Sequence, residues 1–189
     1  MIEPTPDRVR GKLLVATPEL EDPNFFRTVV LVLEHNDEGA LGVVLNRPTS
    51  AELTDPLPAW APLAVEPAVV FMGGPVQPDS AIGLGRRADA GTEPSGFAAL
   101  FGDLGTVDLE RMPVDVAPSV DRVRVFAGYA GWGPGQLESE LAVNGWFVVD
   151  ADEADPWSDD PSAMWRDVLR RQRGQLKVFA DFPFDPATN

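Results

Sequence analysis

A glycine-rich segment that follows a short apolar run constrains the fold more than any other feature. Residues 123–127 are apolar, residues 128–135 bring four glycines, two aromatic side chains and one proline, and residues 136–141 have an amphipathic pattern. Glycine and proline interrupt regular elements, so this order predicts a strand, a glycine turn and the start of a helix. That layout is frequent at functional surfaces of α/β proteins. The segment holds no recognisable reactive group.

Short apolar runs along the chain predict a strand-rich protein. Their lengths and their glycine and proline boundaries fit buried strands better than helices. The second and third runs are joined by residues 35–38, which predicts a hairpin and an antiparallel start. The runs cover residues 11–17, 28–34, 39–48, 69–72, 81–84, 105–109, 122–127 and 146–149.

Proline limits where helices can form. Five prolines between residues 48 and 67 leave room only for a brief helix near residues 51–53. Residues 161–173 predict a longer helix, because apolar side chains recur there at helical spacing between a proline and a glycine. The acidic, proline-containing residues 150–161 predict an exposed loop with little to bury. The tail from Phe182 is expected to be irregular.

Length and charge narrow the class of protein. A chain of 189 residues with 44% hydrophobic residues suits one domain spanning residues 1–189. Thirty acidic and fifteen basic residues give a net charge of −15, which disfavours direct binding to nucleic acid. The absence of cysteine excludes disulfides, thiolate metal sites and cysteine nucleophiles. No apolar run approaches the length of a membrane span, so we expect a cytoplasmic protein without membrane association.

The glycine turn is a candidate anion site. Residues 131–135 can present backbone N–H groups at a helix start, where a phosphate or carboxylate is favoured. The alternative is purely geometric, with the glycines permitting a sharp bend and Trp132 packing closely. Glu138, in the following helix, could face a groove or water.

His35 is the single histidine, and it lies beside Glu34 and Asn36. A histidine paired with a carboxylate can act as a general base, so a hydrolase or transferase that uses His35 with Glu34 or Glu138 is one hypothesis. The sequence has no nucleophile elbow and no paired histidines. A hydrogen-bonded loop histidine is the alternative, and the sequence favours a non-enzyme.

Arg27, Asn46 and Arg47 lie at predicted strand ends. An arginine fork next to the rigid Pro48 suits a carboxylate or phosphate group. The same arginine can instead cap strands or pair with one of the many acidic residues. Both interpretations remain open.

Two charged segments near the C-terminus have competing interpretations. The six acidic residues of 150–160 could bind calcium, but they lack the spacing of a calcium loop, which favours a solvated loop. The predicted helix that follows carries a basic face that could contact an acidic partner or nucleic acid, or could simply be solvated. That face comprises Arg166, Arg170, Arg171, Arg173 and Lys177.

Several separate motifs together resemble those of the YqgE/AlgH family of bacterial proteins. Their order and spacing make the resemblance more specific than any one motif. They are GKLLVATP at residues 11–18, DPNFFRTVV at 22–30, EHN at 34–36, GALG at 39–42, NRP at 46–48, GGPV at 73–76 and the segment 128–138.

The resemblance implies an α+β single domain with a mixed, bifurcated β-sheet that forms a barrel-like core with flanking α-helices. It implies no defined activity, since the relatives are largely uncharacterised. The label of a regulator of alginate transcription belongs to one relative, and the present sequence has no helix-turn-helix pattern. Relatives often carry a histidine after the strand that follows the GGPV motif, whereas residues 82–87 have none. That difference weakens the enzyme hypothesis further.

The sequence therefore favours a cytoplasmic, non-catalytic binding or regulatory protein that uses no cofactor and no metal. Its partner is expected to be a small anionic ligand or another protein. The alternatives are the histidine-based enzyme and an indirect transcriptional regulator acting through the basic helix. Polar strand-end and turn residues are expected to line one ligand groove. They are Arg27, Glu34, His35, Asn46, Arg47, Tyr129, Trp132 and Gln136.

Overall fold

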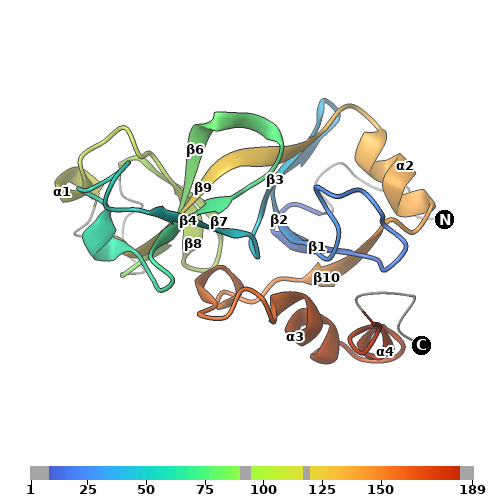
Figure 1. Ribbon diagram of the computed structural model, residues 1–189. Helices are drawn as coiled ribbons and strands as arrows, with labels where there is room; N and C mark the ends of the chain where they lie inside the picture. The colour runs from blue at the N-terminus through green and yellow to red at the C-terminus, as the bar shows by residue number, and fades with distance from the viewer. Residues whose placement is uncertain (1–8, 90–94, 117–119, 184–189) are drawn as a thin grey trace.

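A computed structural model describes residues 9–89, 95–116 and 120–183. Within these residues the strands form one ten-stranded sheet, whose main path runs β10-β1-β2-β3-β9-β6-β8-β7 (Figure 1). The strands are β1 (Lys12–Ala16), β2 (Val29–Asn36), β3 (Gly39–Val44), β4 (Pro48–Glu52), β5 (Val69–Met72), β6 (Val76–Arg87), β7 (Phe97–Phe101), β8 (Leu104–Val107), β9 (Val120–Trp132) and β10 (Trp146–Asp150).

The long strand β9 organises the sheet. It pairs antiparallel with β6 along one edge, while β3 and the short parallel strand β5 share its other edge. The sheet thus branches at β9 and is otherwise antiparallel. In the described part of the chain the end strands β10 and β7 do not pair with each other. The sheet is open, so the expected barrel-like core is not confirmed.

Each face of the sheet has its own core. Side chains alternate along a strand, so Leu13 and Val15 of β1 enter one cluster while Leu14 and Ala16 enter the other. The first cluster is covered by α3 (Met164–Arg170) and the second by α2 (Gln136–Ala142). Figure 1 shows these helices on opposite sides of β1 and β2.

Short helices complete the fold. The 3₁₀ helix η2 (Ala61–Leu63) lies beside β9. Helix α1 (Pro113–Val116) comes directly before β9 in the chain. The 3₁₀ helix η3 (Asp155–Trp157) follows β10, and α4 (Leu176–Phe179) packs against α3. The described protein is therefore one domain with a large sheet and few helices.

A buried arginine joins distant segments at the centre of β9. Arg124 is 2% exposed and lies over the Phe71 ring, with 4.5 Å between the guanidinium carbon and the ring centroid. It donates to the carbonyls of Val65, Glu66 and Ser158. Burial lowers the pKa of Arg124 to about 10. The guanidinium thereby ties two loops to the middle of the sheet.

Two local expectations near the start of the chain are wrong. Residues 51–53 contain no helix, because residues up to Glu52 form β4, which pairs with β5 through Pro48 and Phe71. A proline is tolerated there because it is the first residue of the strand. The hairpin loop is shorter than residues 35–38, since His35 pairs with Ala40 inside the β2–β3 ladder.

The glycine segment is mostly strand. Ala130, Gly131 and Trp132 pair with β3, so β9 continues five residues beyond the apolar run that ends at residue 127. Gly128 has a φ of 66°, a conformation that glycine adopts without strain, and it lets the strand bend. The turn is therefore confined to residues 133–135, just before α2.

The C-terminal third also departs from expectation. Residues 150–161 are not a wholly exposed loop, since Asp155, Pro156 and Trp157 of η3 are buried. The expected helix over residues 161–173 is shorter, and its regular part is α3. Strand β7 was not expected, because its sequence FAALF lacks an alternating pattern. The tail beyond Pro183 lies outside the described residues.

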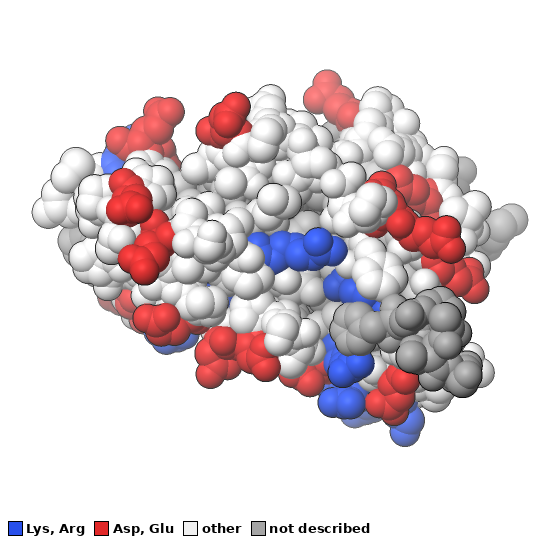
Figure 2. Space-filling model, in the orientation of Figure 1, with Lys and Arg blue, Asp and Glu red and all other residues white. Residues whose placement is uncertain are grey.

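Charge is unevenly distributed over the surface. Figure 2 shows Lys and Arg side chains in the centre of one face and down toward α3, with acidic side chains mostly around the margin. The centre of this face is therefore locally basic, although the protein carries a net charge of −15.

Candidate functional site

Two adjoining grooves lie at the end of β2. The larger has a volume of about 570 Å³ and the smaller about 390 Å³. They share Glu34, Asn36 and Leu41, so they form one continuous depression, called here the β2 groove. The other residues of the larger part are Arg10, Leu33, His35, Ala81, Ile82, Gly83, Ala98, Leu100, Thr106 and Val107; those of the smaller part are Glu38, Gly39, Ala40, Val76, Tyr129, Gly131 and Trp132.

The curvature of the sheet creates this groove. The register of β2 against β3 shifts between Val32 and Glu34, which is a β-bulge, and bulges bend a strand and re-aim its side chains. Beyond the bulge the Glu34 side chain is exposed. On the far side, Arg10 donates to the carbonyl of Ala99 on the end strand β7. The groove thus lies between the β2–β3 hairpin and the β6–β8–β7 part of the sheet.

The groove combines an apolar floor with carboxylates at one side. Leu41, Ile82 and Leu100 pack partly against the main core and leave apolar surface in the groove. Glu34 and Glu38 are exposed, and neither makes an ion pair with any described residue. This arrangement suits an amphipathic molecule that carries a hydrogen-bond donor.

His35 is engaged in a structural contact with α2. Its imidazole is 6% exposed, and its Nε2 donates to Oε1 of Glu138 at 2.8 Å. Hydrogen bonds from its own backbone N–H and from His35 hold the pKa of Glu138 below its usual value. Glu34 is the next residue along the strand, so its side chain projects to the other face. A general base needs an accessible nitrogen, and this imidazole offers none to solvent.

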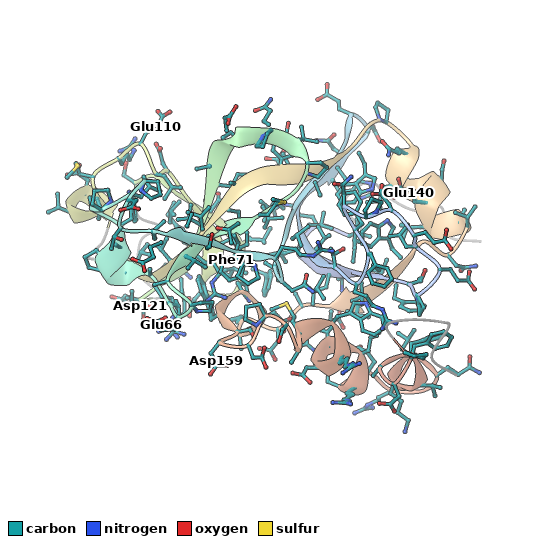
Figure 3. The ribbon with its side chains drawn as sticks, in the orientation of Figure 1. Glu66, Phe71, Glu110, Asp121, Glu140 and Asp159 are labelled. Atoms are coloured by element: carbon teal, nitrogen blue, oxygen red, sulfur yellow. The ribbon has the colours of Figure 1, made fainter. Side chains whose placement is uncertain are left out.

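A second carboxylate fixes the start of α2. Oε2 of Glu140, marked in Figure 3, accepts the indole N–H of Trp132 at 2.9 Å and that of Trp146 at 2.8 Å. Gln136 donates to the other oxygen of Glu140 and accepts the backbone N–H of Gly133. The sequence suggested that this N–H could donate a hydrogen bond to a bound anion. Its partner here is a side chain of the same turn.

The three remaining candidate residues lie at the opposite end of β2. Arg27 is 6% exposed and donates to the carbonyls of Phe182 and Pro183. The Asn46 side chain bridges the backbone of Arg27 and Val29, and Arg47 donates to the carbonyl of Phe26. The structure therefore does not place the eight candidate residues in one groove. Glu34, His35, Tyr129 and Trp132 line the β2 groove, whereas Gln136 is not among the residues that line it.

Some charged residues of the two C-terminal segments pair within the molecule. Asp155 is buried and accepts both terminal nitrogens of Arg171, which raises the pKa of that arginine. Arg170 contacts Asp167 and Asp181. Among the described residues there is no group of three or more histidine, cysteine or carboxylate side chains placed to hold a metal ion.

Several groove residues gave no recognisable signal in the sequence. Leu41 and Ile82 looked like ordinary strand residues, Leu100 lies in the unexpected strand β7, and Arg10 precedes the first strand. They come together only because distant strands converge in the curved sheet. The hairpin motif around Asn36 was the one available indication.

Comparison with known proteins agrees with this architecture. A family model described as AlgH-like matches residues 13–177. The chain belongs to the AlgH-like family. A UPF0301 protein of Streptomyces coelicolor is 54% identical to this AlgH-like chain over 95% of the chain and 94% of the relative. A UPF0301 protein of Thermobifida fusca is 46% identical, again over 95% of this chain and 94% of the relative.

Two solved structures resemble this AlgH-like protein. A crystal structure of a Corynebacterium diphtheriae protein aligns with a TM-score of 0.87 at 33% identity, covering 96% of this chain and 94% of the other. The solution structure of the AlgH protein from Pseudomonas aeruginosa aligns with a TM-score of 0.68 at 29% identity, covering 98% of this chain and 100% of the other. Among the described residues, no helix has the length and apolar character needed to cross a membrane.

Proposed function

We propose that this AlgH-like protein is a non-catalytic binding or regulatory protein whose ligand lies in the β2 groove. The observation that carries the proposal is a continuous depression with an apolar floor and a few convergent polar groups. Its two parts have volumes of about 570 and 390 Å³, within the range typical of small-molecule sites. A rigid sheet supplies the walls, so the groove requires little reorganisation on binding.

The groove favours a ligand with a donor or cationic head group. Glu34 and Glu38 bring two carboxylates to one side, and a carboxylate only accepts hydrogen bonds when ionised. Leu41, Ile82 and Leu100 offer apolar surface to the rest of the molecule. An amphipathic amine therefore fits better than the anion expected from the sequence. The proposed setting is the cytoplasm, as expected from the sequence.

A binding role accounts for the polar residues better than catalysis does. His35 is buried and bonded to Glu138, so a hydrolase or transferase would have to break that contact before the imidazole could take a proton. Glu34 has no proton-transfer partner among the described residues. The carboxylate is instead suited to orienting a bound molecule.

The test is an NMR titration with two ligands that differ only in their head group. Octylammonium is expected to cause saturable shifts at the methyl groups of Leu41, Ile82 and Leu100, with octanoate causing smaller ones. Glu34→Gln should weaken octylammonium binding because it removes the negative charge of the carboxylate. Ile82→Trp should weaken the binding of both ligands because the larger side chain fills the groove.

A variant outside the groove provides the control. Val143 is 75% exposed at the end of α2, so Val143→Trp adds the same side chain without touching the groove. Its octylammonium titration should match that of the unmodified protein. Equal binding by the unmodified protein, Glu34→Gln and Ile82→Trp would contradict the proposed site. Tighter binding of octanoate would contradict the assigned head group.

A further inference from the structure

A second, smaller pocket lies at the opposite end of β2 and β3. It has a volume of about 120 Å³ and is formed by the loop before β2, the end of β3 and the glycine loop between β5 and β6. Arg47 is the only charged residue among those that line it. The others are Pro23, Asn24, Val44, Met72, Gly74 and Pro75.

The guanidinium of Arg47 retains most of its hydrogen-bonding capacity. An arginine has five N–H donors, and Arg47 uses one of them on the carbonyl of Phe26 at 2.7 Å. It makes no ion pair within residues 9–89, 95–116 and 120–183. By contrast, other arginines of this acidic protein pair with aspartate, namely Arg86, Arg87, Arg111, Arg122, Arg170 and Arg171.

Hydrogen bonds fix the chain segment that carries Arg47 beside the pocket. The segments that carry Arg27 and Arg47 are held together, because Asn46 donates to the Arg27 carbonyl at 2.9 Å and Arg47 binds the Phe26 carbonyl. An anion that approaches here gains favourable electrostatic energy.

The glycine loop fixes one wall of the pocket. Gly74 has a φ of 156°, and a Cβ added there would lie 2.1 Å from the carbonyl carbon of Tyr129. Only glycine fits this close approach, so the loop is held tightly against β9. On the other side, the exposed Asn24 carries a side-chain amide that can donate to a ligand. The pocket thus combines one guanidinium, one amide and rigid walls.

We propose that the Arg47 pocket binds a small oxyanion, the carboxylate or phosphate group of a ligand. The guanidinium fork matches the planar geometry of a carboxylate and two oxygens of a phosphate. The volume admits a group of that size and excludes an extended molecule, so the rest of the ligand would lie outside. This site is separate from the β2 groove, and its existence does not depend on the proposed function.

The experiment is a backbone-amide NMR titration with inorganic phosphate and, separately, with acetate, both at constant ionic strength. Saturable shifts are expected at Asn24, Arg47 and Gly74 for at least one of the two anions. The anion that saturates at the lower concentration identifies the preferred group. Arg47→Gln removes the charge, and Asn24→Asp places a like charge beside the ligand. Each substitution should weaken binding about tenfold or more, equivalent to at least ~1.4 kcal/mol.

Arg170→Gln is the matched control, because it removes one arginine that pairs with aspartate outside the pocket. It should leave the titration unchanged. Asn24 is exposed, so Asn24→Asp tests the pocket even if Arg47→Gln fails to fold. In each variant, unchanged chemical shifts at residues far from the pocket verify that the protein is folded. Shifts that do not saturate for either anion, or that persist unchanged in both pocket variants, would overturn the proposal.

Discussion

The two helices that cover opposite faces of the sheet are attached by different forces. Helix α3 buries four large side chains, Met164, Trp165, Val168 and Leu169. Helix α2 is the same length but buries only Leu137. Its attachment depends on two carboxylates, Glu138 on the His35 imidazole and Glu140 on two indole N–H groups.

This difference explains why a structural motif resembled a ligand site in the sequence. A glycine turn between a tryptophan and a helix with carboxylates and a glutamine resembles the loops that carry binding residues on a rigid scaffold. Here the same groups replace the apolar stripe that α2 lacks. Polar residues near a short helix can therefore serve docking within the molecule, and the pattern of residue types alone does not distinguish the two uses.

The largest expected effect is the loss of apolar packing beneath α3. Trp165 is 2% exposed, its indole N–H donates to the Ala16 carbonyl, and the Arg27 guanidinium lies 4.0 Å from its ring. Trp165→Ala should lower the free energy of unfolding by about 3–5 kcal/mol, the usual cost of removing a buried aromatic side chain. Urea unfolding followed by circular dichroism measures this value.

Trp165→Phe separates packing from hydrogen bonding. It keeps an aromatic ring for the Arg27 guanidinium and removes the indole N–H. The decrease in the free energy of unfolding should be clearly smaller for Trp165→Phe than for Trp165→Ala. Equal losses would mean that the hydrogen bond to Ala16, rather than the buried area, attaches α3 to the sheet.

The second prediction concerns the carboxylate that holds two indoles. Glu140→Ala leaves the N–H groups of the buried Trp132 and Trp146 without their acceptor. The cost of orphaned buried donors predicts a loss of about 2 kcal/mol. Glu140→Gln retains an acceptor oxygen and should lose less than half as much. Indole N–H resonances in NMR spectra report the bonds directly, and unchanged resonances in Glu140→Ala would contradict the proposed anchor.

Local patterns predicted the strands but not how they combine. The β-branched run around Val30 is buried on both faces, so its composition identified β2 without other information. The proline-rich stretch around residues 51–53 was wrongly expected to hold a brief helix, because the pairing of β4 with β5 depends on residues that are distant in the sequence. Strand β7 escaped detection because its exposed Ala98 and Ala99 carry no alternating pattern.

The candidate site shows the same limit. Strand-end polar residues were identified, but their grouping depends on which end of β2 each one occupies. Arg27 and Glu34 lie at opposite ends of that strand, so they serve different surfaces. Burial of Asp155 in an acidic segment depended on the partner that Arg171 supplies, a contact across sixteen residues. Composition alone predicted solvent exposure there.

The smallest expected effect is the pH dependence of the α2 attachment. The folded-state pKa of Glu138 lies below its ordinary value of 4.5. Its charge therefore stabilises the fold above pH 4.5, and this contribution is lost as the pH falls through the lower folded-state pKa. Glu138→Gln keeps an acceptor for His35 but removes the charge. At pH 6 the free energy of unfolding of the unmodified protein should be about 0.5 kcal/mol larger than that of the variant, as expected for a partly exposed pair. This difference should close toward pH 3. Urea unfolding of both proteins across this range measures the gap, and because their other carboxylates are identical, a gap that stays constant or widens as the pH falls would contradict the role of Glu138 in holding α2.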